Sequence, residues 1–411
     1  MPVLNMHRMY YLFTMRNEGP DESKLERRNG AGALAIRNFN EAPVYYFEFR
    51  LANAFKVFPL TRTLFPTEIK RIKNKQAYLA VNNSHEAFHD VVDGIYESLV
   101  IEQGIPAEQI ILLSESADIG SVIEESAKKY NLPKIKGEWI LQFEWNTQMC
   151  RRIMLREKRD VVETLVSKEY SKKFLNFNRR WRPHRVQLVA LMKSLGILDQ
   201  GHVSLGEADD HNNWGRMWHW IKFLGSHNPE MNELFEKHEN SIISLPPLYL
   251  DTPNLVDNKA DLDWTTNYLY ADSYFSVVTE TNFYTNTLGV AAQPGRFLSE
   301  KTFKPISMKH PFIIVSVPGM LDKLRELGYK TFSPWIDESY DLELDDNKRL
   351  LKIAKEIKRL CNLSPSEFNV FLRECKKITD HNFDTFINKN KFFYRVNYDE
   401  SELTIDTLPK V

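Results

Sequence analysis

The chain has 411 residues and a formal net charge of −1. Its length exceeds that of a usual single hydrophobic core, so we expect two domains. A hydrophobic fraction of 43% with 27% charged residues excludes a wholly disordered chain, and the near-zero charge argues against a protein that coats nucleic acid over its whole surface. No apolar run approaches the roughly 18–20 residues of a membrane span. Three distant cysteines form neither a disulfide framework nor a paired metal-ligand motif, so we expect a cytoplasmic protein.

Strands alternate with helices in the first part of the chain. The predicted strands are residues 77–81, 109–113 and 139–143, and the predicted helices are residues 84–102, with Ser84 as N-cap, and 119–130. This alternation predicts a mostly parallel sheet that is covered on both faces.

The second part of the chain repeats this pattern. The predicted strands are residues 173–177, 272–279, 311–316 and 330–332, and the predicted helices are residues 184–195, 299–308, with Ser299 as N-cap, 319–327 and 347–390. We therefore predict an α/β fold with two Rossmann-like lobes, residues 1–160 and 161–345, and a helical C-terminal extension, residues 346–411. A helix near residues 150–171 could bridge the lobes.

Charge is distributed unevenly along the chain. Residues 151–185 contain twelve lysines and arginines against four acids, and residues 348–395 contain twelve against five. Between these basic blocks, residues 337–346 carry six acids. Each block is either a solvated helix face or, for at least one basic block, an anion-binding surface.

The start of the predicted helix at 299–308 is a candidate anion site. Ser299, Glu300, Lys301 and Lys304 combine free backbone N–H groups of a helix N-terminus with two cations, which suits a diphosphate. Alternatively, Glu300 complements the helix dipole and pairs with Lys304 one turn later.

The surroundings of this helix resemble a known architecture. A strand ends in Glu280-Thr-Asn282, a loop follows, and the Ser-Glu-Lys helix precedes a Pro-Phe-Ile-Ile strand. Over about 70 residues, 272–341, this order resembles the donor-binding lobe of nucleotide-sugar glycosyltransferases of GT-B type, most closely the fucosyltransferase and exostosin-like groups. The resemblance implies that Glu300 and Lys301 hold the nucleotide ribose and phosphates, with Glu280 and Asn282 in the same cleft. These families usually continue with Ala-Gly-Ala or Ala-Gly-Thr, whereas residues 307–310 are Ser-Met-Lys-His.

An arginine-rich turn follows the strand predicted at 173–177. Its members are Arg179, Arg180, Arg182 and Arg185. Ligands of open α/β sheets bind at the carboxyl ends of strands, and guanidinium groups match phosphate oxygens. We expect one or two of these arginines on the diphosphate, and the alternative is an arginine-rich surface turn. The resemblance extends weakly to this turn, because the same enzymes often carry a basic residue there.

Candidate general bases follow the strand at 77–81. Glu86, His85 and His89 cluster at a predicted helix N-terminus, and an inverting transferase needs a base within hydrogen-bond reach of the acceptor hydroxyl. The alternative is a capping and surface-polar cluster. His85 and His89 could bind a metal, but no third ligand is evident, so we expect neither a metal nor a cofactor besides the nucleotide-sugar co-substrate.

Three tryptophans within residues 214–220 are either core residues or a platform for sugars or bases.

These observations predict a glycosyltransferase of GT-B type, inverting and metal-independent. The lobe at 161–345 would bind the donor, and the lobe at 1–160 would bind the acceptor, by family analogy a glycan. Two alternatives remain open. One is a phage-type DNA-base glycosyltransferase that acts on a hydroxylated pyrimidine. The other is a non-catalytic nucleotide- or glycan-binding protein on a GT-B scaffold.

Overall fold

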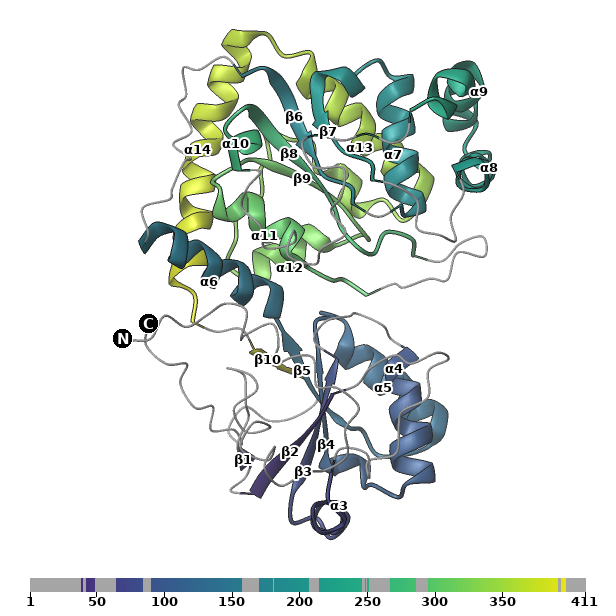
Figure 1. Ribbon diagram of the computed structural model, residues 1–411, viewed down its shortest axis with the longest axis vertical. Helices are drawn as coiled ribbons and strands as arrows, with labels where there is room; N and C mark the ends of the chain where they lie inside the picture. The colour runs from purple at the N-terminus through teal and green to yellow at the C-terminus, as the bar shows by residue number, and fades with distance from the viewer. Residues whose placement is uncertain are drawn as a thin grey trace. The chain divides into compact units, whose positions relative to one another are not determined.

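The computed structural model divides the chain into two compact units. The residues it describes are 38–39, 42–48, 64–83, 90–156, 170–179, 181–206, 214–245, 248, 250, 267–285, 295–390 and 393–396. Unit 1 comprises Met1–Gln142 and Asn390–Val411, and unit 2 comprises Phe143–Lys389. The division lies at Gln142, earlier than the expected boundary at residue 160, and the helices after residue 345 belong to unit 2. Each unit has its own sheet (Figure 1), so the α/β class and two Rossmann-like sheets are confirmed.

The sheet of unit 1 has the strand order β1-β2-β3-β4-β5-β10. Its strands are β1 (Asn38–Phe39), β2 (Ala42–Glu48), β3 (Tyr78–Asn83), β4 (Ile110–Ser114), β5 (Lys136–Ile140) and β10 (Phe393–Val396). Strands β2 to β5 pair in parallel, and β1 and β10 pair antiparallel at the two edges. Every residue of β4 is buried, as expected for a central strand of a parallel sheet.

Helices connect the parallel strands of unit 1. They are α3 (Pro66–Lys73), α4 (Asp90–Ile95), a π-helix (Tyr96–Glu102), a 3-10 turn (Ala107–Gln109) and α5 (Ile119–Tyr130). Helix α5 has the predicted bounds and ends at Asn131 in the left-handed conformation. The strand predicted at 139–143 instead spans Lys136–Ile140, and residues 142–143 belong to helix α6 (Gln142–Arg156). The charged residue Glu138, buried inside the strand, interrupts the apolar pattern on which the prediction was based. The predicted N-cap Ser84 lies outside the described residues.

The sheet of unit 2 has the order β7-β6-β8-β9, with all pairs parallel. Its strands are β6 (Lys172–Asn176), β7 (Gly201–Val203), β8 (Ser273–Thr279) and β9 (Phe312–Val315). From β6 the chain moves to β7 on one side and then returns past β6 to β8. The direction of winding therefore reverses between β6 and β8, and such a switch point is where open α/β sheets bind ligands.

Nine α-helices are described in unit 2. They are α6 (Gln142–Arg156), which begins at the last residue of unit 1, α7 (Pro183–Ser194), α8 (Trp214–Gly225), α9 (Pro229–Ile243), α10 (Asn267–Tyr270), α11 (Glu300–Ser307), α12 (Met320–Glu326), α13 (Asp346–Cys361) and α14 (Pro365–Asn388). Figure 1 shows α7 and α13 on one side of the sheet and α10 and α14 on the other, as expected when winding reverses. Residues 346–361 and 365–388 are helical, as the prediction for 347–390 requires, but residues 393–396 of the predicted helical extension form strand β10 in the sheet of unit 1. Among the helices that the structure describes, none combines the length and apolar character that a membrane crossing requires.

The strand predicted at 330–332 is wrong. This segment carries no sheet hydrogen bonds, because its backbone pairs with a side chain of α14 instead. The Lys330 N–H donates to Asn382 Oδ1 at 2.7 Å, and Asn382 Nδ2 donates to the Lys330 carbonyl at 2.8 Å. An asparagine side chain thus replaces a neighbouring strand as the hydrogen-bonding partner.

The two ends of unit 2 are joined by a buried polar cluster. Lys389 Nζ lies 3.0 Å from the Glu144 carboxylate, which also accepts a hydrogen bond from Tyr329. Gln148 Nε2 donates to the carbonyls of Phe386 at 2.5 Å and Lys389 at 2.9 Å. These bonds hold the start of α6 beside the end of α14, where the chain enters and leaves unit 2.

Candidate functional site

Polar residues follow the strands of unit 2 at their carboxyl ends. Asn178 lies just after β6, and its side-chain amide donates to Asn176 Oδ1 at 2.6 Å and to the Ser204 carbonyl at 3.1 Å. Thr279 at the end of β8 donates its hydroxyl to Asn178 Oδ1 at 2.7 Å. One buried asparagine therefore ties together the ends of β6, β7 and β8, on both sides of the point where the winding reverses.

The loops after β6 and β7 approach closely at Gly206. A Cβ atom at this position would lie 2.2 Å from the carbonyl oxygen of Arg179, so only glycine fits. The Gly206 N–H donates to the Asn178 carbonyl at 2.9 Å, and the Trp181 indole N–H donates to the Gly206 carbonyl. These contacts tie Arg179 and Trp181, on the turn after β6, to the loop after β7.

The end of β8 is fixed to the first turn of α11 through Glu280. The Glu280 carboxylate is completely buried and accepts hydrogen bonds from the Ser299 N–H at 3.0 Å, the Ser299 hydroxyl at 2.6 Å and the Thr302 hydroxyl at 2.6 Å. Ser299 is the N-cap of α11, as predicted, and accepts from the Lys301 N–H. The Glu280 carboxylate thus binds groups of the protein itself, and it positions the helix that carries Glu300 and Lys301.

Glu300 and Lys301 form an ion pair in the first turn of α11. Their charged atoms are 2.6 Å apart, and the Glu300 side chain is 7% exposed while that of Lys301 is 31% exposed. Burial alone would raise the pKa of the Glu300 carboxyl, but the charges of Lys301 and Lys304 outweigh it and hold the pKa below its usual value. Burial and the charge of Glu300 together raise the pKa of the buried Tyr270 phenol. Glu300 is therefore ionised at neutral pH, and its partner Lys301 is partly open to solvent.

The first turn of α7 also meets the end of β8. His184 Nε2 lies 3.0 Å from the Glu280 carbonyl oxygen, and Arg185 donates to the carbonyls of Thr279 at 3.3 Å and Glu280 at 3.4 Å. Burial lowers the pKa of His184 well below its usual value, so the ring is neutral and donates from Nε2. The predicted arginine Arg185 therefore stabilises the backbone at this site. Arg182 is the residue immediately before α7.

Two tryptophans stand beside the arginine-rich turn. The rings of Trp181 and Trp214 form an edge-to-face pair with centroids 5.0 Å apart, and both side chains are partly exposed. By contrast, Trp218 is 5% exposed and packs against Phe235, which makes it a core residue. The tryptophan-rich segment at 214–220 therefore supplies one aromatic ring to the strand-end region and one to the core.

Arg349 of α13 determines where the loops after β8 and β9 lie. Its guanidinium is 1% exposed and donates to the carbonyls of Phe283 at 2.6 Å and Ser316 at 3.0 Å, and it pairs with Asp346 at 2.5 Å. The Ser316 hydroxyl donates to the Asn282 carbonyl at 3.1 Å, which connects the same two loops. Sequence reasoning did not identify Arg349, because the carbonyl groups that it binds, those of Phe283 and Ser316, are backbone atoms far away in the chain.

The structure brings several of the predicted donor-site residues together. Glu280, Ser299, Glu300 and Lys301 form one hydrogen-bonded group, and the charge of Lys304 acts on Glu300. The Asn282 side chain is turned to the Gly295 carbonyl, to which it donates at 2.9 Å. The structure alone identifies three further residues of this region, Thr302, His184 and Arg349. The polar residues at the ends of the strands, 176–178 and 279–282, could be recognised in the sequence as candidates for a site.

Some predicted residues fall outside this description. Arg180 and the candidate bases Glu86, His85 and His89 lie outside the described residues, so they remain predictions. Arg179 is half-buried in the turn after β6. In the part of the chain that the structure describes, no three histidine, cysteine or acidic side chains are grouped as a metal site requires. Comparison of the sequence with models of protein families gave no match, and neither did a search of curated proteins.

Proposed function

We propose that the protein is a nucleotide-sugar-dependent glycosyltransferase of GT-B type whose donor site lies at the carboxyl ends of β6 and β8. The observation that carries the proposal is the attachment of α11 to β8 through Glu280. It fixes the ion pair of Glu300 and Lys301 beside the point where the winding of the sheet reverses. Arg179 and Arg182 follow the neighbouring strand β6.

This arrangement suits a nucleoside diphosphate. A carboxylate that stays ionised can accept hydrogen bonds from both hydroxyls of a ribose, and Lys301 supplies a point charge for phosphate oxygens. The Lys301 ammonium group pairs with the Glu300 carboxylate, and the Lys301 side chain is 31% exposed. A phosphate group of the donor would therefore compete with Glu300 for this ammonium group. The partly exposed rings of Trp181 and Trp214 offer flat surfaces for a base or sugar.

Transfer requires removal of the acceptor proton and departure of the nucleoside diphosphate. In the proposed reaction an acceptor hydroxyl attacks the anomeric carbon, its proton passes to a general base, and the bond from that carbon to the diphosphate oxygen breaks. Lys301 and the arginines would stabilise the charge that develops on the leaving diphosphate. Glu86, His85 and His89 are the candidate bases, and a glycan is the proposed acceptor.

The first experiment measures thermal stabilisation by UDP-, GDP-, CMP- and dTDP-sugars. A donor present at about 100 times its dissociation constant should add roughly 2.7 kcal/mol of stability. We expect one class of donor to stabilise the wild type but neither Glu300→Gln nor Lys301→Ala. Lys222→Ala is the matched control, because Lys222 is 33% exposed and also forms an ion pair, 3.0 Å from Glu239.

The outcomes separate the proposal from its alternatives. If no nucleotide sugar stabilises the protein, the donor site does not exist as proposed. If a donor binds but its nucleotide is not released when glycans or hydroxymethylated DNA are added, the protein is a binding scaffold. Release with the DNA alone would identify a DNA-base glycosyltransferase.

A further inference from the structure

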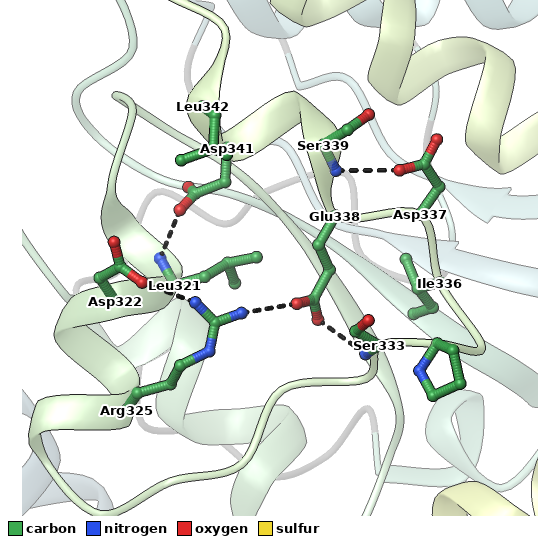
Figure 2. Close-up of a pocket in the computed structure, with 11 residues that line it drawn as sticks. Leu321, Asp322, Arg325, Ser333, Ile336, Asp337, Glu338, Ser339, Asp341 and Leu342 are labelled. Atoms are coloured by element: carbon green, nitrogen blue, oxygen red, sulfur yellow. Dashed lines mark hydrogen bonds and ion pairs between the residues drawn. The ribbon is translucent and has the colours of Figure 1, made fainter.

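A pocket of about 580 Å³ lies in unit 2 beside α12, formed by that helix and the segment from Ser333 to Leu342. Figure 2 shows Leu321 and Arg325 of α12 on one side, Asp341 above Leu321, and Glu338 and Ser339 on the other side. The volume falls within the range of ligand-binding clefts. Neither the strand-end site nor the proposed transfer reaction uses this pocket.

The pocket has an acidic lining. Four of its residues are acids, Asp322, Asp337, Glu338 and Asp341, and one is basic, Arg325. The guanidinium of Arg325 is already neutralised, because it pairs with Asp322 at 2.6 Å and with Glu338 at 2.7 Å.

Two of the acids are held by backbone groups. Asp337 accepts from the Ser339 N–H at 2.9 Å, and Asp341 accepts from the N–H groups of Met320 and Leu321 at 3.1 Å each. Asp341 therefore already supplies an anion to the first turn of α12, and the remaining negative charge favours a cationic occupant.

Two nearby cations are paired with acids outside the pocket lining. Lys352 pairs with Glu343 at 2.8 Å, and Arg359 pairs with Glu356 at 2.6 Å. Hydrogen bonding to the Ser339 backbone, with a smaller contribution from Arg359, lowers the pKa of Asp337, which keeps this exposed carboxylate ionised. The acidic run at 337–346 is thus more than a solvated helix face, since it borders a cavity.

Apolar surface continues beyond the pocket. Leu342, which lines it, is 75% exposed, and Leu344 is 76% exposed, whereas Leu321 and Ile336 are buried in its wall. Two leucines are therefore exposed on alternate residues next to a charged pocket. Such a combination is characteristic of protein–protein contacts, where an apolar centre is flanked by charge.

We propose that this surface, which we call the Leu342 surface, docks a basic segment of a partner protein. A lysine or arginine side chain of the partner would enter the pocket beside Asp337, and a neighbouring apolar side chain would cover Leu342 and Leu344. Charge complementarity and the exposed leucines select this occupant over an acidic or purely polar one.

The test is fluorescence anisotropy with a labelled peptide of sequence Gly-Leu-Lys-Leu-Lys-Gly and the full-length protein. Two further peptides replace either both lysines by glutamate or both leucines by serine. We expect saturable binding of the first peptide only, weakened by salt. The double variant Leu342→Ser/Leu344→Ser should weaken binding by about tenfold, and Asp337→Asn by a smaller factor that shrinks at high salt.

The double variant Ile243→Ser/Val370→Ser is the matched control, because it removes two other exposed apolar side chains, 44% and 39% exposed. Equal weakening by this control, equal binding of the glutamate or serine peptide, or no saturable binding by the wild type would each overturn the proposal. Sedimentation of the protein alone tests the remaining possible occupant of the surface, a second copy of the chain. Self-association that Leu342→Ser/Leu344→Ser abolishes would assign the surface to a second copy of the chain instead. Thermal melts check folding, which substitution at such exposed leucines should leave intact.

Discussion

Arg349 influences the candidate site indirectly, through the loops that it binds. Its guanidinium is buried and donates to carbonyl groups of the loops that follow β8 and β9. Its charge is balanced by Asp346, which is itself 7% exposed. A buried ion pair of this kind need not add net stability over an apolar pair, but loss of one partner leaves an uncompensated charge.

We therefore expect Arg349→Met to lower the free energy of unfolding by about 3–5 kcal/mol, measured by urea denaturation. Lys355→Met on the same helix should change it by less than about 0.5 kcal/mol, because Lys355 is 51% exposed. The double variant Arg349→Met/Asp346→Asn should recover part of the loss. A loss below about 1 kcal/mol for Arg349→Met would show that the loops hold their positions without it.

Asp341 gives a prediction for pH dependence. Burial raises the pKa of its carboxyl from 3.8 to about 6, against the backbone N–H groups that lower it. The folded state therefore binds a proton more tightly than the unfolded state, so this group's contribution to stability falls as pH rises from about 4 to 6. The free energy of unfolding of Asp341→Asn, relative to that of the wild type, should therefore be higher at pH 7 than at pH 4.5.

The control is Asp380→Asn. Burial opposes ionisation of Asp380, but hydrogen bonds from Lys376 and Lys309 hold its pKa below 3.8, so its contribution is lost only below about pH 4. The stability difference between this variant and the wild type should stay nearly constant between pH 4.5 and 7. Equal behaviour of the two variants would contradict the assignment for Asp341.

At the scale of elements, residues close together in the sequence were sufficient to predict helix α11 but not the contacts that surround it. Ser299 as N-cap and the following Glu-Lys pair could be read directly, because capping depends on residues next to one another. The end of this helix is also instructive. Lys309 adopts φ 51°, where glycine is usual, and the His310 N–H donates to the Pro305 carbonyl at 2.9 Å. The chain thus ends this helix in a left-handed conformation without a glycine.

Long-range pairing explains what could not be predicted. Glu280 was expected to line a ligand cleft, but both of its oxygens accept hydrogen bonds within the protein, from Ser299 and Thr302. The segment Lys330-Thr-Phe332 was predicted as a short strand, and only its pairing with Asn382, far along the chain, shows otherwise. Strand β10 was missed for the same reason, since its partner β5 is remote in sequence.

The close approach of the loops after β6 and β7 can be tested at Gly206. Gly206→Ala would place a methyl group 2.2 Å from a backbone carbonyl oxygen, so the loops must separate, and we expect a loss of at least about 2 kcal/mol in urea denaturation. Gly196→Ala is the control. It has φ +72° but nothing within 4 Å of the added atom, so only the backbone conformation opposes it, by about 1 kcal/mol. Equal losses would mean that the contact at Gly206 relaxes easily.

At the scale of the whole molecule, the chain crosses between units twice. In unit 1 the two crossing segments continue as the paired strands β5 and β10. In unit 2 they are joined by Lys389, Glu144 and Gln148. Unit 2 is continuous in sequence, whereas unit 1 is assembled from two stretches.

We expect the fragment Phe143–Lys389 to fold alone and to retain any nucleotide binding of the full-length protein. Its sheet, α13 and the cluster that joins its ends are all included. The measurements are circular dichroism with cooperative urea unfolding, followed by the donor panel. In full-length protein, Val396→Pro should instead destabilise unit 1 selectively, seen by hydrogen exchange, because a proline disturbs the pairing of β10 with β5. A fragment that fails to unfold cooperatively would refute the independence of unit 2.

The return of β10 to the first sheet also bears on the order of events during synthesis. The ribosome releases β5 long before β10, so the nascent first sheet waits with an exposed edge strand while all of unit 2 is translated. Unit 2, being continuous, can complete its fold in that interval. The unit that is translated first is therefore finished last, and its open edge is the place where a nascent chain of this protein is most vulnerable to mispairing and most in need of a chaperone.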